Sequence, residues 1–403
     1  MRVASSVDSR TTGSAGPVEE GQSRQGRRLK IIHLVDSMAM GGAEMLVALL
    51  AQHQRREGHD VAVHCLFEAG SLAASLEESD IPVRVHGVAQ GHLAKVKLMR
   101  RLHRTFSQER PDVVHCHNMS PTILGAPAAR LAGARAVICT RHGLAIPYYA
   151  AKEHPHGVAD PAGALFRFRL ASAYCDRVVA VCEAAQLNLE RGPGSFLYKV
   201  TTIRNGALPM QVSPTPDKSI KKDGFTLISV ARLNWKKNQV VLLRAVAIAR
   251  QDIPDLQLWL IGDGAEADTL RRLAAELGIA SLVRFAGERK DVGDWLNEAD
   301  LFVLSSLTEG LPISLLEAMA VGLPFVVTNV GGMPEIAELS GAGTVVESNA
   351  PEAFAAAIVQ SAQHPSELHE RGRKARECYG RYFTPETMLR SYSQLYQECI
   401  RRR

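Results

Sequence analysis

The chain lacks any apolar run that approaches the ~20 residues needed to span a bilayer as a helix. Its first residues also lack the apolar core that a secretory signal carries. A strong excess of one charge is absent too, because 47 Lys and Arg against 42 Asp and Glu leave a net charge of +5. That value is far from the charge of a dedicated nucleic-acid binder, so nucleic acid is not an expected partner. Any membrane contact is expected to be made from outside the bilayer.

The chain also lacks a pattern of paired cysteines. Its cysteines number seven and lie mostly within apolar, strand-like runs, which predicts reduced core cysteines in a cytosolic protein. The tightest Cys/His cluster is His115-Cys116-His117. Side chains that follow one another along a strand point to opposite faces, which makes this cluster a poor metal cage. No Asp-x-Asp occurs anywhere in the sequence.

What the sequence does contain is an alternation of strand-like and helical runs. Residues 1–28 are polar and are expected to form a disordered leader, and order begins with a short buried strand at Ile31. Further strands are predicted at 60–66, 83–86, 112–116, 136–140, 177–182 and 200–203. Residues 96–106 have a helical period that places Val96, Met99, Leu102 and Phe106 on one face. Strands that alternate with helices indicate a parallel sheet covered on both sides.

A proline-rich polar segment at 207–222 interrupts this alternation and is the best domain boundary. The alternation then resumes, with strands predicted at 225–230, 256–261, 282–286, 300–304, 324–328 and 343–346 and a last helix over about 384–401. The expected fold class is α/β, with two doubly wound parallel-sheet domains over 29–206 and 223–383. Residues 384–403 are expected to form a C-terminal helix that crosses back to the first domain. A ligand is expected in the cleft between the domains.

Two glutamates frame the start of a predicted helix in the second domain. Glu309 lies in the loop after a buried strand, Pro312 suits the first helical turn, and Glu317 lies inside the helix. The helix N-terminus between the two carboxylates is suited to a phosphate, and the carboxylates can accept hydrogen bonds from sugar hydroxyls. The plainer interpretation is a solvated loop residue and an ordinary exposed helical glutamate.

Two cations follow the first strand of this domain, on the same predicted edge as Glu309. Arg232 and Lys237 could hold a diphosphate and neutralise the charge that grows on it as it leaves, whereas Lys236 suits a solvated turn better. In the first domain, Gly41-Gly42 joins a strand to a helix and lets a ligand approach the backbone. This turn departs from G-x-G-x-x-G, so no nicotinamide fingerprint is present.

The Glu309/Glu317 spacing, the Arg232/Lys237 pair, the Gly41-Gly42 turn and Asn205-Gly206 together resemble glycosyltransferase family 4, over roughly residues 30 to 400. The resemblance implies a GT-B fold and a retaining, nucleotide-sugar-dependent enzyme. It implies that Arg232 and Lys237 grip the donor diphosphate, Glu317 the ribose, and Glu309 the donor sugar near its phosphate. It also implies that His142 touches the transferred sugar. The donor-binding positions that the resemblance implies are Gly41, Gly42, Asn205, Gly262, Glu288, Arg289, Lys290, Gly310, Leu311, Ile313 and Glu317.

The expected reaction is transfer of a hexosyl group from a nucleotide-diphosphate sugar to an acceptor hydroxyl. A UDP-sugar is favoured and a GDP-sugar is the alternative donor, with a role in polysaccharide, lipopolysaccharide or glycolipid assembly. The resemblance implies attack on the same face, with Glu309 as an electrostatic group. Because the chain contains no Asp-x-Asp, and cationic side chains and a helix dipole can do what a divalent metal does, no cofactor or essential metal is expected. Two other classes stay open, a GT-B nucleotide-sugar epimerase and a non-catalytic sugar-nucleotide-binding protein. Fold alone does not decide between them.

The first domain also contains a basic amphipathic segment. Over residues 95–104 an apolar stripe is flanked by the cations Lys95, Lys97, Arg100, Arg101 and Arg104. Such a helix can lie against anionic headgroups, or it can be an ordinary solvated surface helix. The expectation is a cytoplasmic enzyme, with a lipid-linked acceptor at the inner face of the membrane as one alternative.

Overall fold

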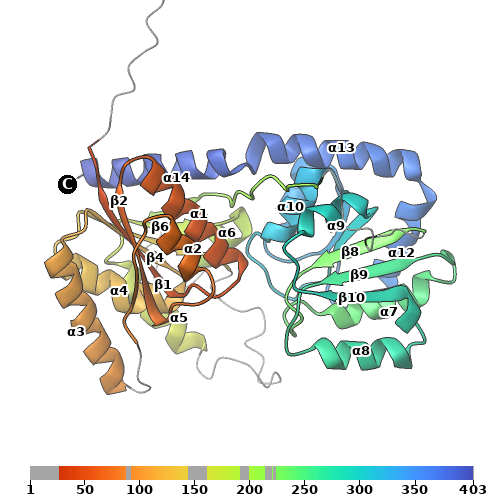
Figure 1. Cartoon of the computed structure of the whole chain (residues 1–403), viewed down its shortest axis with the longest axis horizontal. Coiled ribbons are helices and arrows are strands. Elements are labelled where there is room, and N and C mark those ends of the chain that lie inside the picture. Colours follow the sequence, from red (N-terminus) through yellow and green to blue (C-terminus); the bar gives the residue numbers. More distant parts are fainter. Residues whose placement is uncertain are drawn as a thin grey trace, which may run out of the picture.

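The protein, seen in a computed structural model, folds around two parallel sheets that lie side by side (Figure 1). The structure describes residues 27–87, 92–143, 161–190, 199–213, 220 and 224–402. The expected leader therefore lies outside the described residues, except for Arg27 and Arg28. The expected fold class, α/β with two doubly wound parallel-sheet domains, is confirmed.

The first sheet has seven parallel strands in the order β3-β2-β1-β4-β5-β6-β7. Helices α1 and α2 cover one face, while α3, α4 and α5 cover the other. The strands are β1 (Lys30–Ser37), β2 (Asp60–Glu68), β3 (Val83–Val85), β4 (Val113–His117), β5 (Ala136–Arg141), β6 (Arg177–Ala180) and β7 (Val200–Thr202). The helices are α1 (Gly42–Arg56), α2 (Ala73–Glu78), α3 (His92–Glu109), α4 (Met119–Leu131), α5 (Pro161–Ser172) and α6 (Glu183–Glu190).

The second sheet has six parallel strands in the order β10-β9-β8-β11-β12-β13. Its strands are β8 (Thr226–Val230), β9 (Gln257–Ile261), β10 (Val283–Gly287), β11 (Leu301–Leu304), β12 (Phe325–Thr328) and β13 (Gly343–Val346). Its helices are α7 (Gln239–Ala249), α8 (Ala267–Glu276), the 3-10 turn η2 (Ala280–Leu282), α9 (Val292–Glu298), α10 (Ile313–Val321), α11 (Met333–Ser340), α12 (Pro351–Gln363) and α13 (Pro365–Tyr382). The last helix of the chain is α14 (Pro385–Arg401).

The predicted strands are confirmed to within two residues at each end, because buried parallel strands are continuous apolar runs that turns interrupt. One helical prediction is wrong in detail. The buried stripe of α3 is made by Leu98, Leu102 and Phe106, whereas Val96 is 48% exposed. The spacing of four residues keeps those three side chains on one face, and Val96 falls outside that face. All seven cysteines are buried and free.

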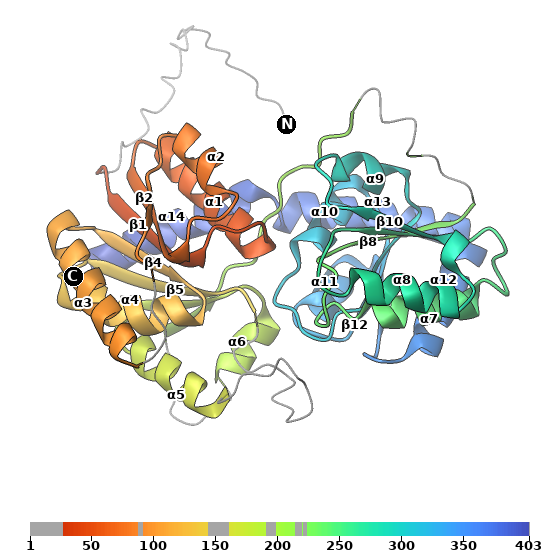
Figure 2. The same cartoon turned by 60° about the horizontal axis from the view of Figure 1, so that its bottom comes forward.

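The chain crosses between the domains twice, at neighbouring places. The backbone N–H of Ala207 donates to the Phe383 carbonyl at 3.0 Å, and the Tyr379 hydroxyl donates to the Ala207 carbonyl at 2.9 Å. After the second crossing α14 packs onto the first domain, where Tyr392 and Tyr396 enter its core. Figures 1 and 2 show α13 and α14 running across both domains. None of the helices in the described part of the chain combines the length and the apolar character that a membrane-spanning helix needs.

Candidate functional site

The centre of the candidate site is an ion pair between the loops that follow β8 and β11. The Lys237 Nζ atom lies 2.5 Å from Glu309 Oε1, and the Ser306 hydroxyl donates to the same oxygen at 2.6 Å. Ser305 fixes the two loops to each other, because its hydroxyl bonds the carbonyl oxygens of Lys237 and Asn238, each at 2.9 Å. The carboxyl ends of adjacent parallel strands thus bring a cation and an anion to one sheet edge, as the sequence predicts.

Arg232 extends from the same edge toward the first domain. Its guanidinium donates to the carbonyl of Met40, directly before the Gly41-Gly42 turn. Gly41 is the residue before α1, and a Cβ atom there would meet the Arg232 guanidinium at 2.6 Å. A Cβ at Gly42 would lie 3.4 Å from the Ile313 side chain. The glycine turn therefore allows the two domains to approach closely at Arg232 and Ile313.

His142 and Gly310 form a second approach between the domains. His142 follows β5, and a Cβ at Gly310 would overlap the His142 carbonyl oxygen. The Asn205 amide, 4% exposed, donates to the Leu311 carbonyl at 2.8 Å. Residues at the end of the first domain thus hold the loop that carries Glu309. The structure places Asn205 in this interface as a link between domains.

Helix α10 begins directly after this loop. The sequence predicts Pro312 in the first turn of this helix. In the structure Pro312 is instead the N-cap, in extended conformation (φ −70°, ψ 126°), and the helix begins at Ile313. Glu317 lies one turn further on, and burial raises its pKa from 4.5 to about 7. This finding differs from the plainer interpretation of an ordinary exposed glutamate. A partly buried carboxyl beside a helix N-terminus can accept hydrogen bonds from hydroxyl groups.

The remaining donor-side positions follow β9 and β10. Gly262 has φ +126° and lies against the Ala231 carbonyl, where a side chain would not fit. Its N–H donates to the Gly287 carbonyl at 2.7 Å. Of the next residues Glu288 and Lys290 are exposed, whereas Arg289 is paired with Asp291 at 2.6 Å.

The predicted basic residues lie apart from this centre, on α3 of the first domain. The side chains of Lys95, Lys97, Arg100, Arg101 and Arg104 are all exposed. Two apolar side chains at the start of the helix are exposed as well, Leu93 at 81% and Val96 at 48%. In Figure 1, α3 lies on the outer side of the first domain, away from the second.

The histidine cluster differs from its sequence interpretation. His115 and His117 are two positions apart in β4, so they share one face, and His33 of β1 joins them there. All three are buried, and their ring nitrogens lie within 4.8 Å of one another, close enough to hold a metal ion. The sequence argument considered neighbouring side chains only and missed a third histidine from an adjacent strand.

Several residues at the site were not singled out from the sequence. Ser305 and Ser306 fix the Lys237–Glu309 pair, and a serine pair at the end of a predicted strand could have suggested this. Glu44, in the first turn of α1, interacts electrostatically with Arg232, and burial raises its pKa above 4.5. Gln54, buried in α1, bonds His33, and nothing in the local sequence indicates that contact.

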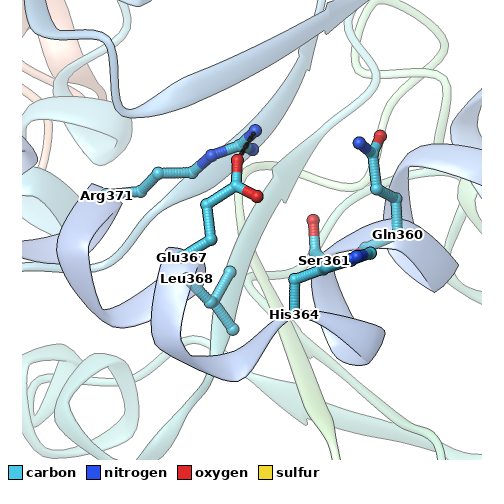
Figure 3. Close-up of a pocket in the computed structure, with 6 residues that line it drawn as sticks. All are labelled: Gln360, Ser361, His364, Glu367, Leu368 and Arg371. Carbon is cyan, nitrogen blue, oxygen red and sulfur yellow. Dashed lines mark hydrogen bonds and ion pairs between the residues drawn. The ribbon is translucent and has the colours of Figure 1, made fainter.

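One further pocket lies outside this site. Figure 3 shows it between α12 and α13, with Arg371 paired to Glu367 at 2.7 Å. Figures 1 and 2 place α12 on the part of the second domain that is distant from the first. None of the site residues lines this pocket.

Comparison with known proteins agrees with this geometry. Residues 215–377 match the family described as Glycosyl transferases group 1, and residues 40–207 match Glycosyltransferase Family 4. EpsD of Bacillus subtilis (strain 168) is 31% identical over 337 residues, which cover 79% of this chain and 84% of EpsD. An Escherichia coli protein named UDP-Gal:alpha-D-GlcNAc-diphosphoundecaprenol alpha-1,3-galactosyltransferase is 26% identical over 83% of this chain and 88% of its own length.

Solved structures show the same fold. Anabaena HepE in complex with UDP superposes with a TM-score of 0.77 at 23% identity, over 92% of this chain and 100% of that chain. The fold and the family matches define a GT-B glycosyltransferase. The chain belongs to glycosyltransferase family 4, so the resemblance seen in the sequence is confirmed and the chain is a transferase.

Proposed function

We propose that this enzyme transfers a hexosyl group from a UDP-sugar to a hydroxyl of a lipid-linked saccharide, with retention of configuration and without an essential metal. The observation that carries the proposal is the Lys237–Glu309 pair beside Arg232, across from the Gly41-Gly42 turn. Two cations at one sheet edge match a diphosphate, and they would stabilise the charge that develops on it as the glycosidic bond breaks.

Four charged residues of the site have roles in this proposal. Arg232 and Lys237 bind the diphosphate, and Glu317 accepts hydrogen bonds from the ribose hydroxyls. Glu309, held by Lys237 and Ser306, lies near the reacting carbon as a positioning and electrostatic group. The acceptor attacks the face that the leaving diphosphate occupies, and a donor phosphate oxygen takes the acceptor proton. Configuration at the anomeric carbon is then retained.

The choice of UDP is supported by related proteins. HepE was solved with UDP and with UDP-glucose, and the Escherichia coli relative is named for UDP-Gal and a diphosphoundecaprenol acceptor. A lipid-linked acceptor agrees with α3, where exposed cations surround the exposed side chains of Leu93 and Val96. Such a surface can rest on anionic headgroups.

Thermal stabilisation by UDP, GDP and ADP tests the donor site. A bound nucleotide at a hundredfold excess over its Kd adds about 3 kcal/mol, so only the correct base should shift the melting temperature strongly. Lys237→Ala should abolish that shift, while Lys236→Ala, which changes an adjacent lysine beside Trp235, should keep it. An unchanged shift in Lys237→Ala would mean that the diphosphate binds elsewhere.

Product analysis tests the reaction itself. NMR of the anomeric proton reports retention, and reactions with and without acceptor separate transfer from epimerisation. Activity that a chelator removes and Mg²⁺ or Mn²⁺ restores would contradict the metal-independent mechanism.

Sedimentation with anionic vesicles tests the membrane surface. The pair Lys97→Gln and Arg100→Gln on α3 should weaken binding, because each cation near the surface contributes about 1 kcal/mol. The matched pair Arg271→Gln and Arg272→Gln, both exposed on α8, should not. Equal binding by the two double variants would remove α3 from the proposal.

A further inference from the structure

The face of the first sheet that α1 and α14 cover carries a line of polar side chains that the proposed function does not use. His33 lies in β1, His117 at the end of β4 and His142 directly after β5, which are adjacent strands. Gln54 reaches the same line from α1 and is 1% exposed. His33 and His117 are 0% and 3% exposed. The line begins inside the first domain and ends at a residue of the interdomain site.

The nitrogen and oxygen atoms of this line are spaced for three consecutive hydrogen bonds. Gln54 Oε1 lies 2.8 Å from His33 Nε2, and His33 Nδ1 lies 3.0 Å from His117 Nε2. His117 Nδ1 then lies 3.1 Å from His142 Nε2. At the end of the line, His142 Nδ1 is buried and has no hydrogen-bond partner among the described residues.

The number of N–H groups on each imidazole determines which ring nitrogens donate and which accept along the line. A neutral imidazole carries one N–H, and burial keeps these three neutral because it lowers the pKa of His33 to about 4, that of His142 to about 3 and that of His117 well below 6.5. The Gln54 oxygen only accepts, so His33 must donate from Nε2 and accept at Nδ1. His117 then donates from Nε2 and accepts at Nδ1. His142 in turn donates from Nε2, and its Nδ1 carries a lone pair.

We propose that Gln54, His33 and His117 are positioning residues that hold His142 in the tautomer with Nε2–H bonded inward and Nδ1 offered as an acceptor to a hydroxyl group of the donor sugar. The inference rests on the proposed function, because that function supplies the sugar. A buried acceptor needs a donor partner, and a sugar hydroxyl can provide one, whereas a carboxylate or carbonyl oxygen would be repelled.

The hydrogen-bonded line of Gln54, His33, His117 and His142 is called the relay below. The orientation of the Gln54 amide decides the direction of every hydrogen bond in it. If the amide were reversed, its NH₂ group would donate to His33, every bond in the line would invert, and His142 would present an N–H instead. In the orientation seen, Gln54 Oε1 lies 2.8 Å from His33 Nε2, and Gln54 Nε2 is buried with no hydrogen-bond partner among the described residues. The tautomer of His142 therefore reports the orientation of the Gln54 amide directly.

Imidazole ¹⁵N NMR on the full-length, histidine-labelled protein tests the relay without any substrate, because protonated and unprotonated ring nitrogens have distinct shifts. We expect His33, His117 and His142 to be neutral Nε2–H tautomers, with His33→Phe and His117→Phe used for assignment. A Nδ1–H tautomer at His142 overturns the proposal. So does a metal ion bound by His33 and His117 in the purified protein, because the metal would replace their hydrogen bond.

A binding experiment tests the consequence for the sugar. UDP-glucose, UDP-galactose and UDP-N-acetylglucosamine are each compared with UDP, which separates sugar recognition from diphosphate recognition. Gln54→Leu should reduce the preference for the best UDP-sugar over UDP by about tenfold, the equivalent of one hydrogen bond, and leave the affinity for UDP unchanged. Gln54→Glu, which keeps an acceptor oxygen, should retain most of the preference.

Controls separate the relay from a merely structural role and from the donor-site proposal. Gln52→Leu, on the same helix, should leave the preference unchanged. A Gln54→Leu protein that is less stable but keeps the wild-type preference overturns the positioning role. A wild-type protein that binds every UDP-sugar no more tightly than UDP overturns the contact between His142 and the sugar. A protein that fails to bind UDP contradicts the donor site instead, and the NMR result then still decides the tautomer.

Discussion

Replacing Glu317 with Gln should stabilise the ligand-free protein, and the gain should grow as the pH rises. Burial in α10 raises the pKa of Glu317 from 4.5 to about 7. Because the folded-state pKa lies above the unfolded one, ionisation favours the unfolded chain. The cost is small near pH 4.5, increases between pH 4.5 and 7, and is complete above pH 7.

The magnitude follows from the two pKa values. A difference of roughly 2.5 units corresponds to about 3 kcal/mol at pH 8, and to about 1 kcal/mol at pH 5, where most of the cost is absent. One kcal/mol shifts the melting temperature of a domain of 150–250 residues by about 2–4 °C. Glu317→Gln should therefore melt about 6–12 °C above wild type at pH 8, and only a few degrees above it at pH 5.

Differential scanning calorimetry at pH 5, 6, 7 and 8 measures this difference. Glu276→Gln, which changes an exposed glutamate of α8 in the same domain, serves as the control and should show no pH-dependent gain. A difference between Glu317→Gln and wild type that stays constant with pH would refute the reasoning. A Gln variant that is less stable at pH 8 would refute it as well, since Glu317 would then have a partner that its carboxylate needs.

The same titration should be visible in ligand binding. If ribose hydroxyls donate to Glu317, they favour its ionised form, so UDP binding near pH 7 should release part of a proton. Calorimetry in two buffers of different ionisation enthalpy measures that proton, and the release should vanish in Glu317→Gln.

Two further predictions concern closure of the domains. Gly310→Ala should lower turnover more than tenfold without abolishing UDP binding, because the added methyl group would overlap the His142 carbonyl. Gly380→Ala, with open space around it, is the control. Unchanged kinetics of Gly310→Ala would show that closure tolerates the methyl group. Glu335→Gln should increase the radius of gyration measured by small-angle X-ray scattering, since Glu335 accepts a hydrogen bond from Arg204 of the first domain at 2.6 Å in a partly buried pair. The control is Glu338→Gln, which changes an exposed glutamate. Identical profiles for the two variants would mean that this bond does not hold the domains together.

Much of the fold could be predicted because the strands are buried on both faces and appear in the sequence as continuous apolar runs. The position of the candidate site followed from the same regularity. Once β8 and β11 were predicted as parallel strands, their carboxyl ends had to lie at one sheet edge, and with them Lys237 and Glu309. The sequence also placed Gly41-Gly42 correctly between a strand and a helix.

What the sequence could not predict depends on contacts between distant segments. His33 pairs in register with His115, 82 positions away, and only the order of strands in the sheet reveals that neighbourhood. The bond from Gln54 to His33 depends in addition on how α1 lies over that sheet. The raised pKa of Glu317 has the same origin, because its burial is produced by neighbouring elements and not by α10 alone.

The place where the chain crosses twice determines how this enzyme can open. Gly206 lies so close to the Thr384 carbonyl that a Cβ would reach it at 2.6 Å, and Ala207 bonds Phe383 in the returning segment. Since α14 is packed into the core of the first domain, neither crossing can slide independently. We therefore expect any opening to rotate the second domain about this double connection. Such a rotation would strain the contacts between the domains, among them those of Arg232 with Met40, of Asn205 with Leu311 and of Arg204 with Glu335. Binding of a diphosphate at Arg232 would therefore compete with a contact that holds the domains together.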